Sequence, residues 1–266
     1  MAGAIHNLFR HVLIRQRLAQ PGVAVALAAA AVIGGAGGII PGGFLAQPGG
    51  AGLAAGASWG CWAFVFMSPL LGGVVAATLT ASRFDHDVDR DLFLAGLSAR
   101  QTIVDDALAA FAAAASMALC AACAGAIVGL GDAVSRHGAV LGNFSPLALI
   151  AAAGASAWWT VHGVCFATWL RSSLRACGLL IALLLVALAV LGTVRSQAAW
   201  TVLAASPAAI LTLAANGSIG AARGLDTPVA LAVGAATFWL IVLAGLAWRS
   251  AGRIRPPHEL GRRDAS

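Results

Sequence analysis

The chain has 266 residues, of which 60% are hydrophobic and 10% are charged, and its mean hydropathy is +0.89. A soluble domain carries roughly 25% charged residues, because its exterior must be largely polar. A soluble fold is therefore excluded, and disorder is excluded because disordered chains are poor in hydrophobic residues. The composition predicts an all-α polytopic membrane protein that lies in the lipid bilayer.

The basic residues narrow the class further, because all 16 are arginine and the chain has no lysine. A phosphate-binding loop that ends in Gly-Lys-Ser/Thr is excluded, and so is a Schiff-base pigment or a pyridoxal cofactor. A net charge of +6 could suggest a nucleic-acid partner. In so apolar a chain we interpret the charge as a signal of membrane topology, with no nucleic acid involved.

Six apolar segments are predicted to cross the membrane, which takes about 20 residues each. They cover residues 22–40, 57–80, 104–130, 146–170, 176–194 and 228–248. Pro69 is expected to kink the second span. Residues 22–248 together form the predicted transmembrane domain.

The distribution of arginines predicts the orientation. Thirteen of the 16 lie in the N-terminal segment, in the loops after the second and fourth spans, and in the C-terminal tail at 249–266. The opposite loops hold only Arg136, Arg195 and Arg223. The positive-inside rule then places both termini in the cytoplasm and the chain in the plasma (inner) membrane.

Two flanking segments have their own patterns. Residues 1–21 are predicted to contain an amphipathic helix in the cytoplasmic interface, with a frayed polar tail as the alternative. The segment 196–226 is apolar but is broken by Pro207 and Gly217. We predict that it forms two short re-entrant helices in the outer leaflet, because a seventh span would place the C-terminal arginines outside.

No constellation for catalysis or for metal binding is present among the polar residues. Asp105 and Asp106 are interpreted as N-terminal charges of the third span, facing the positive end of the helix dipole. Trp158 and His162, four residues apart, share a helix face that either lines a cavity or packs against a neighbouring helix. Trp62 and Phe66 on the second span leave the same two alternatives open. These four residues are the candidates for a substrate pathway.

The most informative segment is the cytoplasmic loop at 81–103. It holds four alternating aspartates (Asp85, Asp87, Asp89 and Asp91), then the apolar Leu92, Phe93, Leu94 and Leu97, then Ser98 and Arg100. A linker needs far fewer residues and no hydrophobic face. The pattern therefore predicts a helix that docks on a cytoplasmic partner.

These features resemble the type 2 ABC exporter permeases. That family combines six spans, an interfacial N-terminal helix and a loop helix that begins Asp-Arg and continues through apolar residues to Leu-(Ser or Pro)-x-Arg. Asp89-Arg90, Leu92 to Leu94 and the run from Leu97 to Arg100 are similar to that pattern. Short outer helices with Ser-Pro precede the last span in the family, as Ser206-Pro207 does here. Asp105-Asp106 replaces a basic residue that is common in the family.

The resemblance implies a transporter of two permease chains, as a homo- or heterodimer, and two separate ATPase subunits that bind ATP and Mg²⁺. This chain itself would bind no cofactor and would not be an enzyme by itself. The residues implied to couple the ATPase to the permease are Asp89, Arg90, Asp91, Leu92, Phe93, Leu97, Ser98 and Arg100. The implied cargo is a hydrophobic or amphiphilic drug, antibiotic, peptide or lipid, moving along the second and fifth spans near the dimer seam.

Two other classes stay open from the sequence. A secondary, ion-coupled transporter should have intramembrane charges or interrupted helices at equivalent positions of two halves. A non-transport membrane protein, such as an assembly factor or an immunity protein, would have no ATPase partner.

Overall fold

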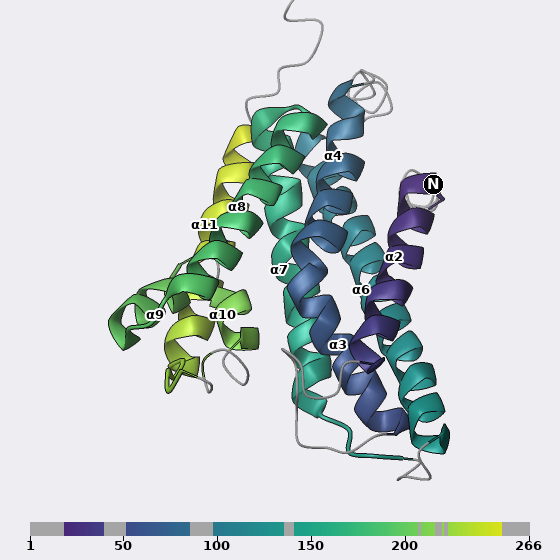
Figure 1. Ribbon diagram of the computed structural model, residues 1–266. Helices are drawn as coiled ribbons and strands as arrows, with labels where there is room; N and C mark the ends of the chain where they lie inside the picture. The colour runs from purple at the N-terminus through teal and green to yellow at the C-terminus, as the bar shows by residue number, and fades with distance from the viewer. Residues whose placement is uncertain are drawn as a thin grey trace, which may run out of the picture.

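The computed structural model describes residues 19–39, 52–85, 98–135, 141–206, 209–215, 220 and 223–251, and within these ranges the chain forms helices and no strands. The helices are α2 (Pro21–Ile39), α3 (Leu53–Ser68), the π-helical η1 (Pro69–Val74), α4 (Val75–Asp85), α6 (Ala99–Ser135), α7 (Pro146–Leu170), α8 (Ser173–Thr193), α9 (Gln197–Ala204), α10 (Ala209–Ala215) and α11 (Val229–Ala251). Figure 1 shows the long helices side by side in one bundle.

Several of these helices are membrane spans by length and composition. Within the described residues, five stretches are long and apolar enough to cross a bilayer. They are Leu53–Phe84, Arg100–Ser135, Ala148–Leu170, Ser173–Thr193 and Val229–Ala251. The first predicted span, 22–40, corresponds to α2, whose apolar part, Pro21–Gly37, is shorter. The prediction of an all-helical, multi-pass membrane protein is confirmed.

The second span is one continuous column of α3, η1 and α4, although Pro69 was predicted to kink it. The ring of Pro69 displaces the carbonyl one turn before it, and the missing N–H removes one hydrogen bond. The chain responds with a π-helical turn over Pro69–Val74, a common way to absorb such a break. Gly73, inside this turn, lies against Gly163 of α7. A Cβ atom at Gly163 would clash with the backbone carbonyl of Gly73.

Small residues bring α2, α3 and α6 into close contact. A Cβ atom at Gly56 would lie 2.9 Å from the Cα of Gly129, and one at Gly129 would lie 2.8 Å from the Cα of Gly56. Gly34 of α2 lies equally close to the backbone of Ala121 on α6. The four-residue glycine spacing in the sequence is thus used for helix packing, as is common in membrane proteins.

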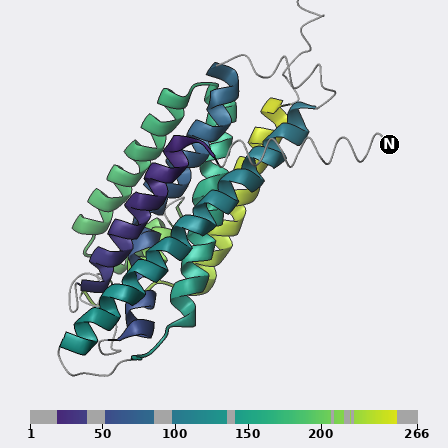
Figure 2. The ribbon, with the colours of Figure 1, turned by 90° about the vertical axis from the view of Figure 1, so that its right-hand side faces the viewer.

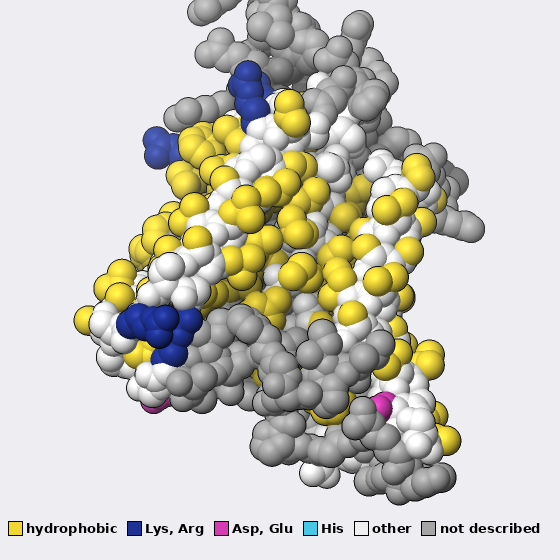
Figure 3. Space-filling view, in the orientation of Figure 1, with side chains coloured by type: hydrophobic (Ala, Val, Ile, Leu, Met, Phe, Trp, Pro, Cys, Tyr) yellow, Lys and Arg dark blue, Asp and Glu magenta, His cyan; other side chains and the backbone are white. Residues whose placement is uncertain are grey.

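The outer surface of the bundle is apolar, as lipid contact requires. Only 6% of the most apolar window of α11 is buried, and 28% of that of α8. Figure 2 separates these two helices, which overlap in Figure 1, and places them on opposite sides of the view. In Figure 3 arginine side chains gather at the two ends of the visible face, with hydrophobic side chains between them. This is the pattern of a surface in contact with a bilayer.

The segment between α8 and α11 contains the short helices α9 and α10. Arg223 donates hydrogen bonds of 2.8 Å to the carbonyls of Leu191, Gly192 and Val194 and so caps the C-terminal end of α8. The indole of Trp200 donates to Thr227 Oγ1 at 2.9 Å. The Arg223 contacts fasten the segment to α8, and the Trp200 contact joins α9 to the residues just before α11.

Three predicted features lie partly or wholly outside the described residues. They are the interfacial helix, whose residues 1–18 are not described, most of the coupling loop, 86–97, and the tail from residue 252.

Candidate functional site

The candidate site lies where α4 ends and α6 begins, on either side of the predicted coupling loop. Ser98 and Arg100 are described, whereas Asp89, Arg90, Asp91, Leu92, Phe93 and Leu97 lie outside the described residues. Ser98 and Gln101 form a capping box, because Gln101 Oε1 accepts from the Ser98 amide at 2.9 Å and Ser98 Oγ accepts from the Gln101 amide at 3.3 Å. This pair of contacts explains why α6 begins here.

The centre of the site is a buried ion pair between the two helices. Arg83 Nη1 lies 3.2 Å from Asp106 Oδ2, and the two side chains are 0% and 2% exposed. The same guanidinium nitrogen donates to Thr102 Oγ1 at 2.7 Å. A buried charge is costly unless it is paired and hydrogen-bonded, so Arg83 binds α4 firmly to the first turns of α6.

Asp105 and Asp106 do not have the role that the sequence suggested. The interpretation as N-terminal helix charges is wrong, because α6 begins at Ala99 and has no acidic residue in its first turn. The favourable effect of a helix dipole fades within that turn. Hydropathy placed the start of the helix too late, since residues 99–103 belong to it. Asp106 instead neutralises Arg83, and Asp105 is also buried.

A second contact at this end of the bundle joins α6 to α11. The Arg100 guanidinium carbon lies 5.1 Å from the centre of the Trp248 ring, a cation–π geometry. Arg100 was predicted to take part in coupling, and it touches the last turns of the final span. A displacement of the start of α6 would therefore reach both α4 and α11.

The four predicted pathway residues are all buried within the single chain. The structure brings Trp158 and His162 together, with ring centroids 4.4 Å apart and a contact of 2.8 Å between His162 Nδ1 and the Trp158 carbonyl. Trp159 and Phe166 complete an aromatic environment, at 5.2 and 5.9 Å from the imidazole. Trp62 and Phe66 belong to the same hydrophobic core. In this conformation the four side chains pack the core.

Among the described residues, no three His, Cys, Asp or Glu side chains lie close enough together to hold a metal ion. The contacts of Arg83 have a mechanical effect, because they hold the end of α4 against the first turns of α6. From the sequence, Arg83 was interpreted only as a topological charge, and its pairing with Asp106 and Thr102 was not predicted. The signal in the sequence that could have indicated this pair is a basic residue at the end of the second span and an acidic residue at the start of the third.

No protein-family model matches the chain, and no curated protein or solved structure matches it.

Proposed function

We propose that the chain is the membrane-spanning permease subunit of an ATP-driven ABC exporter and moves a hydrophobic or amphiphilic substrate out of the cytoplasm. A separate ATPase subunit supplies the energy. The observation that carries this proposal is the ion pair of Arg83 and Asp106, which joins the helices on both sides of the loop where such an ATPase would push.

The coupling step follows from the contacts around the loop. A force on residues 86–97 acts on α4 and α6 at once, because their ends are linked through Arg83. Without that link, the two helix ends could separate and the loop would move alone. The Arg100–Trp248 contact extends the connection to α11. Movement of the ATPase thus becomes a joint movement of the second, third and last spans.

The proposed topology has six spans, with α2 as the first, and both termini in the cytoplasm. The length of α2, 19 residues, corresponds to about 28 Å of helix, close to the ~30 Å of a hydrocarbon core. The short helices α9 and α10 then lie in the outer leaflet. A second permease chain completes the transporter.

The cargo route in this proposal runs between the two permease chains, along the second and fifth spans. Trp62 and Phe66 on α3, with Trp158 and His162 on α7, supply aromatic walls for an apolar cargo. Because all four are buried in the present conformation, the cargo can reach them only when α3 moves relative to α7 or α8. ATP-driven movement of α4 and α6 would provide that opening.

An ion-coupled transporter is the second candidate, and the buried carboxylates of Asp105 and Asp106 are the observation that favours it. Both lie in the second and third turns of α6, near one end of the bundle, whereas coupling-ion sites of such transporters lie near the bilayer midplane. Their position beside Arg83 suits a structural ion pair better.

The test is purification of the tagged chain from its native membrane in mild detergent, followed by reconstitution. An ABC ATPase should co-purify, and inverted vesicles should take up a lipophilic fluorescent dye only when ATP is supplied. A hydrolysis-deficient ATPase is the matched control. Uptake that continues without ATP and stops when ionophores collapse the ion gradients would favour the ion-coupled transporter. Absence of both the ATPase and transport would contradict the proposal.

A further inference from the structure

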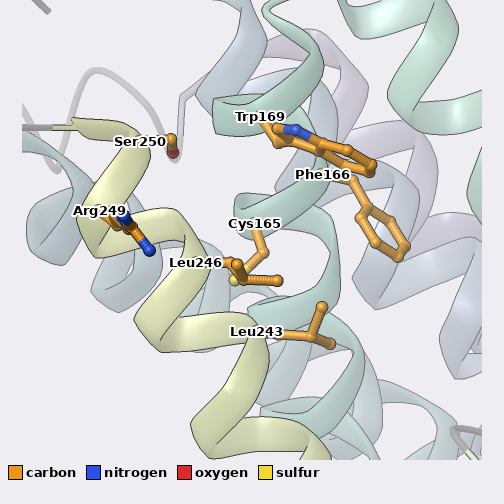
Figure 4. A pocket seen from close by; sticks show the side chains of 7 residues that line it. All are labelled: Cys165, Phe166, Trp169, Leu243, Leu246, Arg249 and Ser250. Atoms are coloured by element: carbon orange, nitrogen blue, oxygen red, sulfur yellow. The ribbon is translucent and has the colours of Figure 1, made fainter. Parts of the chain in front are cut away.

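A half-open groove lies between the C-terminal halves of α7 and α11. It has a volume of about 300 Å³ and is lined by Cys165, Phe166 and Trp169 on α7 and by Leu243, Leu246, Arg249 and Ser250 on α11. Figure 4 shows Leu246 of α11 directed toward Cys165 of α7. None of the predicted pathway residues belongs to this lining, although Phe166 also lies 5.9 Å from the His162 ring.

The groove is amphipathic along its length. Arg249 and Ser250 lie at the end of α11, whereas Leu243 lies almost two turns earlier, about 9 Å along the helix axis. Figure 4 shows the Arg249 side chain extending from α11 toward Leu246 and Cys165. One end of the groove therefore offers a cation and a hydroxyl, and the remainder offers aliphatic and aromatic walls.

The groove opens on the outside of the bundle. Trp169 is 66% exposed and Leu246 is 58% exposed, and most of the α11 surface is uncovered. Exposed tryptophans beside arginines at the end of a span are typical of the interface between hydrocarbon and lipid head groups. The groove therefore lies at the level of the head groups and opens toward the acyl chains.

Two further arginines lie close to the lining residues along the chain or through Trp248, and together with Arg249 they favour an anion. Arg100 lies over the Trp248 ring, next to Arg249 in the sequence. Arg171 is exposed directly after the end of α7, two residues beyond Trp169. Basic pockets between transmembrane helices on the cytoplasmic side are suited to anionic lipid head groups. A neutral head group would leave this charge uncompensated.

We propose that this groove binds one anionic phospholipid of the cytoplasmic leaflet. Its phosphate is held by Arg249 and Ser250, and one acyl chain lies along Leu243, Leu246 and Phe166. The volume is near the lower end for ligand pockets, which suits part of one chain rather than a whole lipid. This inference does not depend on the exporter function, and only its choice of leaflet rests on the predicted topology.

The test uses the full chain and a defined pair of lipids, phosphatidylglycerol and phosphatidylcholine. Native mass spectrometry counts the lipids retained on the protein after purification in detergent supplemented with equal amounts of both. The wild type should retain phosphatidylglycerol preferentially. Arg249→Gln should lower the retention of phosphatidylglycerol at least fivefold. Arg195→Gln is the control and should leave it unchanged, because it removes an exposed arginine just after the C-terminal end of α8, outside the groove lining. Leu246→Trp, which fills the groove, should reduce retention as Arg249→Gln does.

A thermal scan in phosphatidylcholine micelles checks folding, because a variant that melts as the wild type does there has kept its structure. Added phosphatidylglycerol should then raise the melting temperature of the wild type and of Arg195→Gln, but not that of Arg249→Gln. Equal loss of retention in both arginine variants would overturn the proposal, because the lipid would respond to net charge alone. Unchanged retention in Arg249→Gln would also overturn it. Dissociation of an oligomer at unchanged retention would assign the groove to a contact between two copies.

Discussion

Arg83 on α4 and Asp106 on α6 form an ion pair with 3.2 Å between Nη1 and Oδ2, and neither side chain is in contact with solvent. The pair lies beside the loop that joins the two helices. The end of α4 and the first turns of α6 are therefore fastened to each other.

Breaking this pair is expected to destabilise the protein. Arg83→Met or Asp106→Leu alone should lower the free energy of unfolding by about 3 kcal/mol, because the remaining charge is left buried without its partner. The double variant should lose much less than the sum of the two, since no unpaired charge remains. Denaturant unfolding in detergent measures all three, with Arg175→Met as the control at an exposed arginine. Strictly additive losses would contradict the coupling.

The close contact between α3 and α6 predicts a sharp difference among glycines. Gly56→Ala and Gly125→Ala should each lower the stability by about 1–3 kcal/mol, because a Cβ atom at either position meets the backbone of the facing helix. Gly178→Ala on α8 is the matched control, since no atom lies within 4 Å of its Cβ position. Its melting temperature should equal that of the wild type or exceed it slightly. Equal melting temperatures for all three variants would show that the contact contributes nothing.

The apolar runs predicted the helices well, because hydropathy reports what lies inside the bilayer. The fourth span, 146–170, has the same bounds in the sequence analysis and in α7. The prediction failed where a helix continues into polar sequence. Residues 99–103 belong to α6 because Ser98 and Gln101 cap its start, and the hydropathy of the segment does not report capping.

The candidate site was harder to predict than the spans. The charges of Arg83 and Asp106 are visible in the sequence, but their contact depends on how α4 and α6 are placed in space. The groove between α7 and α11 likewise joins residues from two spans that are distant in the chain. Trp158 and His162 were predicted to share a face, because a spacing of four residues fixes that within one helix.

The cap on α8 gives a local prediction. Arg223→Ala should expose the carbonyls of Leu191, Gly192 and Val194 and lower the free energy of unfolding by about 1 kcal/mol. The loss is small because hydrogen bonds to water replace the three charge-assisted hydrogen bonds. Hydrogen exchange should become faster in the last turn of α8 and in α9, and should stay unchanged in α3. Arg195→Ala, at an exposed neighbour, is the control. Identical exchange in the two variants would mean that the cap does not stabilise α8.

The six-span topology predicts opposite sides for two positions. A cysteine at residue 140 should react with a membrane-impermeant maleimide from outside the cell, and one at residue 260 only after the membrane is opened. The native cysteines, Cys61, Cys120, Cys123, Cys165 and Cys177, must be replaced first. Labelling of both positions from the same side would contradict the three spans predicted between them.

The coupling loop gives the most direct test of the proposed function. The double variant Phe93→Ala, Leu97→Ala should lose ATPase association and reduce ATP-dependent dye uptake at least tenfold, because buried apolar anchors dominate such interfaces. Asp85→Ala should have a mild effect, since rim charges contribute mainly to association rates.

The paired variant Arg83→Met, Asp106→Leu separates docking from transmission. It leaves the proposed anchors in place, so the ATPase should still co-purify and hydrolyse ATP. Uptake per ATP hydrolysed should fall, because α4 and α6 are no longer joined by charge at the base of the loop. Melting temperature in detergent establishes that this variant folds. A coupling role for the loop would be contradicted if the Phe93→Ala, Leu97→Ala variant kept normal uptake and normal ATPase association. Normal uptake in the paired variant would contradict only the role of the ion pair.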